Sequence, residues 1–139
     1  MTASKSLRAL REAIVLEHLE AENEREFEGA VGVFDHARWE VMATGEVIEG
    51  RAAVVGYYER VVAAGPRLWS RVVSLHHAEG AVIVELRLDG DGVGGRSGVF
   101  FLFDGARLVG KRVYGGWEEK SRHPVAGMAA PLSSDGNRT

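Results

Sequence analysis

The chain has 139 residues, of which 45% are hydrophobic and 27% charged, a composition typical of one ordinary globular domain. Lys and Arg total 17 against 20 Asp and Glu, and the net charge of -3 argues against a nucleic-acid partner. The absence of cysteine excludes disulfides, thiolate nucleophiles and cysteine-ligated zinc. Any chemistry must therefore come from His, Tyr, Trp, Ser or carboxylate side chains.

The first half of the chain predicts three helices and one strand, with a turn or short hairpin after the strand at Thr44-Gly45 and Glu49-Gly50. Apolar residues spaced three and four apart, beginning with Leu7, Leu10 and Ile14, are typical of an amphipathic helix, and Gly65-Pro66 ends the last helical run. Around Trp39 the side chains alternate instead, which indicates a strand. We therefore expect helices over about 5–24, 27–35 and 51–64 and a strand over 38–42.

The second half of the chain predicts an antiparallel meander. Hydrophobicity alternates with a period of two through four segments. The surplus of glycine, 18 in the chain, is concentrated in the turns between them and is expected to serve those turns alone. The strands are expected over 69–77, 81–89, 97–103 and 108–114. Residues 120–139 carry too little apolar surface to offset the entropy of ordering, so we predict a single domain at 1–119 followed by a flexible C-terminal tail.

Helices followed by a meander are the order of an α+β fold, in which three N-terminal helices pack on one face of a curved, mostly antiparallel sheet. The strand around Phe101 is apolar on both faces, and we expect the outer face to pair two copies as a homodimer. No secretory signal and no membrane-spanning apolar run is visible. These features predict a cytoplasmic protein without a membrane partner.

Four segments of the chain resemble the nuclear transport factor 2-like superfamily, specifically its SnoaL-like branch of polyketide cyclase relatives. They are Leu19–Asn23, Trp39–Glu46, Glu49–Val54 with the tyrosine pair at 57–58, and Phe101–Gly105 running on to Lys111–Tyr114. The resemblance spans residues 7–117 and implies a cone-shaped fold around a pocket. Known members include cyclases, isomerases, epoxide hydrolases and non-catalytic binders, so the reaction must be argued from the pocket.

The predicted pocket is apolar and suits a small hydrophobic molecule of aromatic or polyketide-like character. The inward side of the meander and the resemblance together indicate its lining. The candidate ligand-binding residues are Trp39, Val41, Trp69, Val84, Leu86, Val99, Phe101 and Tyr114.

His18 and Tyr58 are the candidate catalytic residues. The spacing of His18 from Ile14 and Val15 puts the imidazole on the buried face of the first helix, where the resemblance implies a pocket donor. The resemblance also implies an aromatic residue at Tyr58, whereas Tyr57 is expected to point elsewhere. Both candidates fit a structural role as well, as a core histidine bonded to a carbonyl and as a packed tyrosine.

Two hypotheses of function follow. In the first, the protein is a cyclase or isomerase acting on an aromatic or polyketide-like ketone, with His18 as general acid/base and Tyr58 steadying an oxyanion. In the second, it is a non-catalytic binder that has lost the acidic residues of the family, because the resemblance implies carboxylates near Val41 and Val99. No cofactor is expected, and no metal, because His76 and the next residue point to opposite faces of a strand.

Overall fold

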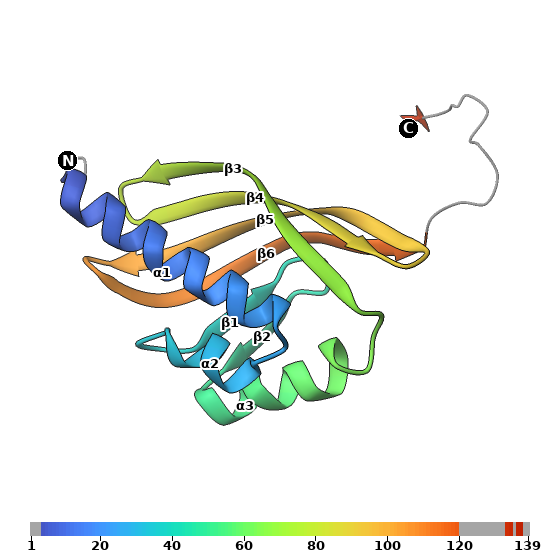
Figure 1. Ribbon diagram of the computed structural model, residues 1–139, viewed down its shortest axis with the longest axis horizontal. Coiled ribbons are helices and arrows are strands. Elements are labelled where there is room, and N and C mark those ends of the chain that lie inside the picture. The colour runs from blue at the N-terminus through green and yellow to red at the C-terminus, as the bar shows by residue number, and fades with distance from the viewer. Residues whose placement is uncertain (1–3, 120–132, 135, 138–139) are drawn as a thin grey trace.

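The computed structural model describes residues 4–119 and two short strands, β7 (Ser133–Ser134) and β8 (Gly136–Asn137), which pair with each other (Figure 1). Most of the tail predicted over 120–139 lies outside the described residues. The main elements in chain order are α1 (Lys5–Asn23), α2 (Phe27–Gly32), β1 (Arg38–Val41), β2 (Glu46–Glu49), α3 (Arg51–Tyr57), the π-helical turn η1 (Tyr58–Val62), β3 (Leu68–Ala78), β4 (Ala81–Gly90), β5 (Val93–Asp104) and β6 (Arg107–Glu119).

Strands β1 to β6 form one mixed sheet in the order β2-β1-β6-β5-β4-β3. Neighbouring strands are antiparallel except β1 and β6, which run parallel with Trp39 opposite Lys111. Figure 1 shows β3 to β6 as long bent strands and β1 and β2 as a short pair at one edge. This is an α+β fold, as the sequence predicts.

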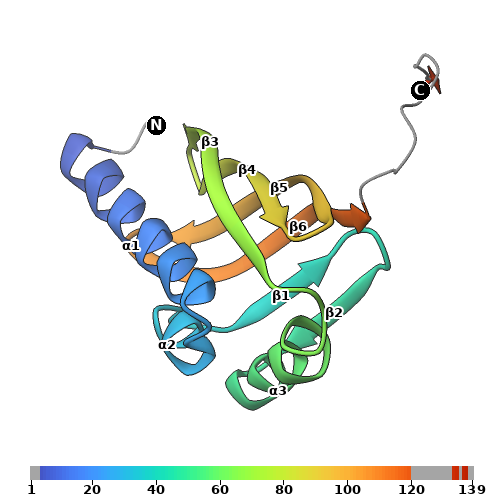
Figure 2. The ribbon, with the colours of Figure 1, turned by 45° about the vertical axis from the view of Figure 1, so that its right-hand side comes forward.

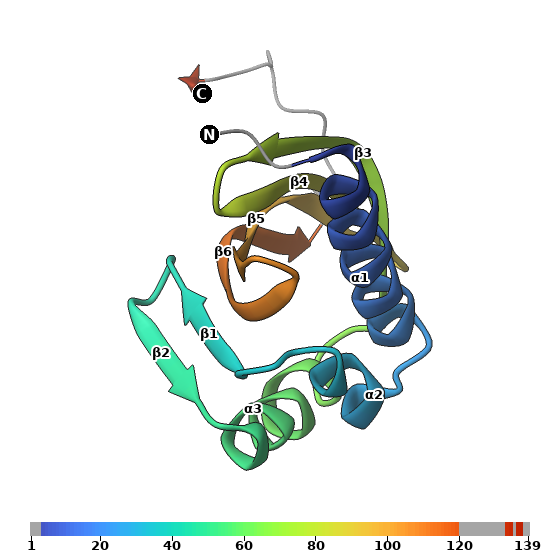
Figure 3. The same cartoon turned by 90° about the vertical axis from the view of Figure 1, so that its left-hand side faces the viewer.

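Helix α1 lies across one face of the long strands, and α2 and α3 lie together beyond its C-terminal end (Figures 2 and 3). Its buried side includes Val15 and Leu19, which join the hydrophobic core formed with β4 and β5. Arg11 is also buried, and its guanidinium donates to the carbonyl oxygens of Glu79 and Gly105 at 3.0 and 2.8 Å. The helix is thereby tied to the β3–β4 turn and the β5–β6 turn.

The sheet extends further than the alternation predicts, and the glycines explain why. Strand β5 already begins at Val93, and β6 continues to Glu119. A Cβ atom at Gly95 would collide with the carbonyl oxygen of Gly116, and Gly115 has a φ of 77°. The expectation that the glycines serve only turns is therefore wrong, because several of them let β5 and β6 approach closely and bend.

The third helix changes its winding halfway. It is α-helical to Tyr57 and then forms the wider π-helical turn η1, whose first residue is Tyr58. Such turns occur frequently at functional sites. Within the described part of the chain, no helix is both long enough and apolar enough to cross a bilayer.

Candidate functional site

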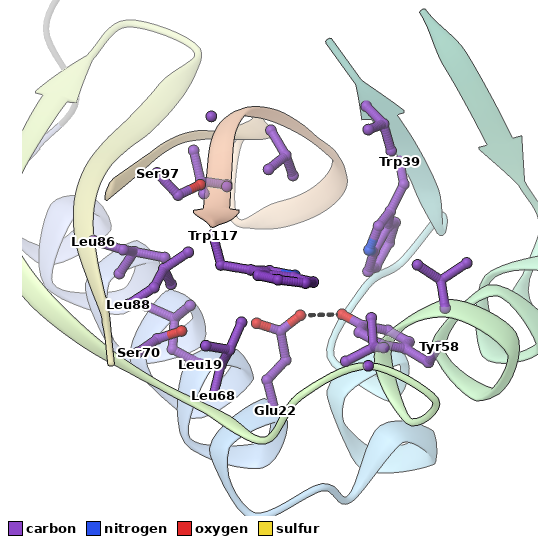
Figure 4. Close-up of a pocket in the computed structure, with 18 of the residues that line it drawn as sticks. Leu19, Glu22, Trp39, Tyr58, Leu68, Ser70, Leu86, Leu88, Ser97 and Trp117 are labelled. Atoms are coloured by element: carbon purple, nitrogen blue, oxygen red, sulfur yellow. Dashed lines mark hydrogen bonds between the residues drawn. The ribbon is translucent and has the colours of Figure 1, made fainter. Parts of the chain in front are cut away.

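Four side chains from three parts of the chain form a connected polar cluster. His18 and Glu22 come from α1, Tyr58 from η1 and Lys111 from β6. The Lys111 Nζ atom lies 2.9 Å from both His18 Nε2 and Glu22 Oε2, and the Tyr58 hydroxyl donates a short hydrogen bond to the same carboxylate oxygen. Figure 4 shows the bond between Tyr58 and Glu22. We call these four residues the inner cluster.

His18 is held as a neutral imidazole in this cluster. Its Nδ1 atom lies 2.8 Å from the Ala30 carbonyl oxygen, which assigns the proton to Nδ1 and leaves Nε2 to accept from Lys111. Burial, and then the charge of Lys111, lower the pKa of His18, while Glu22 acts in the opposite direction. The rings of Phe34 and Phe101 pack edge-on against the imidazole at 5.0 and 5.6 Å.

Glu22 is held as an ionised carboxylate. Burial alone would raise the pKa of Glu22, but the charge of Lys111 above all keeps it well below the usual range of a glutamate. Burial and then the Glu22 charge raise the pKa of Tyr58, so this phenol stays neutral and donates. Within the described chain no hydrogen bond is formed by the second carboxylate oxygen, Oε1, and the Glu22 side chain keeps 20% of its surface exposed.

The inner cluster opens on a pocket of about 370 Å³, a size suited to a small organic molecule. Figure 4 shows Trp39, Tyr58 and Trp117 around the Glu22 carboxylate. Most of the wall is aliphatic or aromatic and is contributed by α1, β1, α3, η1 and the long strands. The lining residues with ionisable or hydroxyl groups are Glu22, Arg25, Tyr57, Tyr58, Ser70, Ser97 and Lys111.

The structure brings several of the predicted residues together at this pocket. Its wall includes Trp39, Val41, Tyr58, Leu86 and Val99. His18 does not line the pocket, because the Lys111 ammonium stands in front of its Nε2 atom. The imidazole is thus in contact with the inner cluster but out of direct reach of a ligand.

Two predicted aromatic residues point away from the pocket. On β3 and β6 the neighbours Ser70 and Val113 line the pocket, and alternation therefore turns Trp69 and Tyr114 to the opposite face. Both of these aromatic side chains are exposed. The Tyr114 ring packs instead on Phe100, at 5.6 Å between centroids.

Two further predicted residues lie too deep to reach a ligand. Val84 and Phe101 are fully buried in the core and do not line the pocket, although they share the inward face with residues that do. Tyr57, in contrast, does line it, which corrects the expectation that it points elsewhere. Successive residues of a helix are about 100° apart, and a wide opening can be reached by both members of the tyrosine pair.

The site residues predicted from the sequence do not include Glu22, Lys111, Arg25 and Trp117. Glu22 follows His18 by four residues, which places both on one face of a helix, and this signal was available. Alternation does not predict that Lys111 faces the pocket, because the register shifts between β5 and β6. The shift leaves both Leu108 and Lys111 buried, whereas strict alternation would put them on opposite faces.

Among the residues that the structure describes, no three His, Asp or Glu side chains gather where they could hold a metal ion.

No family model and no curated protein matches this sequence.

Solved structures do resemble this one closely. An NTF2-like protein of unknown function from Burkholderia xenovorans has a TM-score of 0.67 at 16% identity, covering 91% of this chain and 96% of that chain. A protein with a ketosteroid isomerase-like fold from Catenulispora acidiphila, in complex with trimethylamine, has a TM-score of 0.64 at 17% identity, covering 73% and 83%. SalBIII, an epoxide hydrolase/cyclase-like enzyme of pyran ring formation in salinomycin, has a TM-score of 0.66 at 23% identity, covering 79% and 95%. The chain therefore has the nuclear transport factor 2-like fold.

Proposed function

We propose that the pocket binds a small, largely apolar ketone and that the inner cluster performs acid–base chemistry on it, of the isomerase or cyclase type. The observation that carries this proposal is the Glu22 carboxylate, which is ionised, has an oxygen without a hydrogen bond within the described chain, and lies at a pocket whose wall is mostly apolar. The lowered pKa makes Glu22 a weak base while Lys111 is paired with it, so proton transfer to Glu22 must be coupled to a shift of the ammonium group toward the oxygen on which the enolate charge develops.

The proposed step is proton transfer from the carbon next to the ketone to Glu22 Oε1. As the carboxylate becomes neutral, it holds the Lys111 ammonium and the Tyr58 hydroxyl less strongly, and both donors become available to the enolate oxygen. The charge beside Lys111 moves from carboxylate to enolate, so the total charge is unchanged. Return of the proton to another carbon gives an isomerase. Attack of the enolate carbon on a second carbonyl group opens its C=O π bond to an alkoxide, which takes the proton back from Glu22, and this gives a cyclase.

His18 has a positioning role in this scheme. It accepts a hydrogen bond from Lys111 and is itself fixed by the Ala30 carbonyl, so it directs the ammonium group toward Glu22. The general acid/base role predicted for His18 is thereby assigned to Glu22, the carboxylate that lines the pocket. Tyr58 keeps the role of an oxyanion donor, which its raised pKa supports.

A non-catalytic binder is the second candidate, and two observations favour it. The Lys111 ammonium and the Tyr58 hydroxyl are already bonded within the cluster, and valine stands at 41 and 99 in the pocket wall. In this case the inner cluster would only complete the fold around an apolar ligand.

Exchange of the acidic protons of 2-tetralone for deuterium, followed by NMR, distinguishes the two candidates. We expect the protein to accelerate exchange and Glu22→Gln to reduce that acceleration by about 100-fold or more. Glu40→Gln is the matched control, because Glu40 is paired with arginines and is similarly exposed but lies outside the pocket. If Glu22→Gln and the unaltered protein exchange the protons at equal rates, and circular dichroism shows that both are folded, the non-catalytic binder is the candidate that remains.

A further inference from the structure

The charged groups that line the pocket do not cancel. Glu22 and Lys111 form an ion pair at 2.9 Å, and the remaining charged residue of the described lining is Arg25. Within the described chain no carboxylate forms an ion pair with Arg25. Its Nη1 atom donates to the Val62 carbonyl oxygen at 3.1 Å, and its guanidinium lies 6.0 Å from the centroid of the Phe27 ring. The pocket therefore carries one uncompensated positive charge.

The backbone at Arg25 is unusual as well. Its φ of 61° lies in the left-handed region, and it is the one non-glycine residue with positive φ in the described part of the chain. Glycine is the residue that commonly fills such a position just after a helix. Arg25 occupies this position although the backbone conformation favours glycine. Its guanidinium donates to the carbonyl oxygen of Val62, which also lines the pocket, and is thereby fixed at the pocket wall.

The charges also speak against a cationic ligand. The Lys111 ammonium already lies 4.9 Å from the centroid of the Trp39 ring, so the aromatic surface next to Glu22 holds a cation of the protein itself. A second cation would meet both Lys111 and Arg25. An anion, in contrast, finds N–H donors of Arg25 that have no partner in the described structure, since a guanidinium has five and one is used.

We infer that the ligand of this pocket is an apolar carboxylic acid whose carboxylate binds Arg25 while its apolar body extends toward the inner cluster. The inference rests on the proposed function and narrows it, because the substrate would then be a keto acid rather than a neutral ketone. Paired oxygens on a planar carboxylate match the planar donors of a guanidinium.

Arg25 could instead have a purely structural role. A cation just beyond the end of α1 complements the helix dipole, and the bond to Val62 joins the turn after α1 to η1. This role predicts that replacing Arg25 changes stability and leaves the preference among ligands unchanged. Ligand preference, rather than stability, therefore tests the inference.

The test compares 2-naphthoate with 2-naphthamide, which has the same ring system and almost the same shape but no charge, by isothermal titration calorimetry at pH 7. We expect the protein to bind the acid about tenfold more tightly than the amide, the range of a hydrogen-bonded charged group. In Arg25→Gln the ratio should fall to about twofold or less, while amide binding changes little. Arg25→Gly, which the φ of 61° accommodates, serves as a second variant if the first does not fold.

Arg67→Gln is the matched control. Arg67 also donates to a backbone carbonyl, that of Asn23 at 3.1 Å, and lies over an aromatic ring, but it does not line the pocket. It should keep the preference for the acid. Equal binding of acid and amide, or a preference that survives in the Arg25 variants, would overturn the carboxylate inference alone. If neither probe binds and 2-tetralone is not exchanged, the proposed function falls together with it.

Discussion

Two ion clusters lie on opposite faces of the parallel strand pair β1 and β6. Lys111 faces inward and pairs with Glu22, whereas its neighbour Arg112 faces outward and donates to Glu40 at 3.3 Å. Arg38 donates to the same Glu40 carboxylate at 2.6 Å. We call these three residues on the outward side the outer cluster.

The glutamates of the two clusters are almost equally accessible to water, whereas the lysine of the inner cluster is much less accessible than the arginine of the outer cluster. The side chains of Glu22 and Glu40 are 20% and 19% exposed, but Lys111 is 6% exposed against 34% for Arg112. The pKa of Glu40 is lowered too, since Arg112 and Arg38 outweigh the effect of its burial. A lowered carboxylate pKa therefore does not distinguish the clusters. The difference is that Lys111 is almost inaccessible to water. If its partner Glu22 is lost, water can hardly take the place of the carboxylate.

The largest effect is expected from replacing this buried cation. Lys111→Met would leave the Glu22 carboxylate without its cation and should lower the free energy of unfolding by about 3 kcal/mol. Arg112→Met should cost about 1 kcal/mol or less, because Glu40 keeps Arg38 and water. Urea unfolding at pH 7 measures both. Equal losses in the two variants would mean that the inner pair is no different from a surface pair.

The second-largest effect is the dependence of folding stability on pH that His18 causes. Since the folded protein holds the pKa of His18 below 6.5, the unfolded chain binds the proton more readily. The stability due to this group is complete above about pH 6.5 and is lost as the pH falls through the folded value. We expect the melting temperature of the unaltered protein to drop more between pH 7.5 and 5.5 than that of His18→Gln.

His36→Gln is the control for this pH profile, because His36 is exposed and pairs with Glu49 at 2.7 Å outside the pocket. It should retain the pH dependence of the unaltered protein. A profile of His18→Gln that runs parallel to that of the unaltered protein would show that the imidazole does not titrate differently in the folded state.

The fold was far more predictable from sequence than the inner cluster. Helical spacing located α1 to within a residue, and alternation found the four long strands, because both follow from which side chains meet the core. The cluster depends instead on where α1 crosses β6, and on a register shift that turns Lys111 inward. Neither the crossing nor the shift leaves a periodic signal. Two members of the cluster, His18 and Tyr58, were predicted from the sequence. Glu22 was within reach through its spacing from His18, whereas Lys111 was not.

A smaller effect is expected from removing one hydroxyl group of the inner cluster. Tyr58→Phe keeps the ring stacked on Phe27, at 4.8 Å between centroids, but takes away the bond to Glu22. We expect a loss of about 1 kcal/mol in unfolding free energy, together with slower exchange of 2-tetralone. Tyr114→Phe, which removes a hydroxyl group outside the pocket and leaves the bond to Glu22 in place, should change neither quantity appreciably. If it slowed exchange as much as Tyr58→Phe, the role proposed for the Tyr58 hydroxyl would be wrong.

The smallest effect on the stability of one subunit is expected on the outward face, which we propose as the surface that joins two copies. Tyr114 is exposed there beside Phe100, on the same face as the outer cluster. Tyr114→Glu should therefore change the unfolding free energy of an isolated subunit by about 0.5 kcal/mol or less, while it places like charges opposite each other across a twofold axis.

Light scattering measures the second consequence directly. We expect the mass of two chains for the unaltered protein and of one chain for Tyr114→Glu, whereas Leu10→Glu, at an exposed apolar position of α1, should keep the mass of two. A mass of one chain for the unaltered protein would overturn the proposed pairing of two copies and would leave Arg112 and Glu40 in water. A mass of two that depends on Tyr114 would instead place the outer cluster at the edge of an interface, and Arg112→Met should then weaken the dimer more than it weakens the subunit.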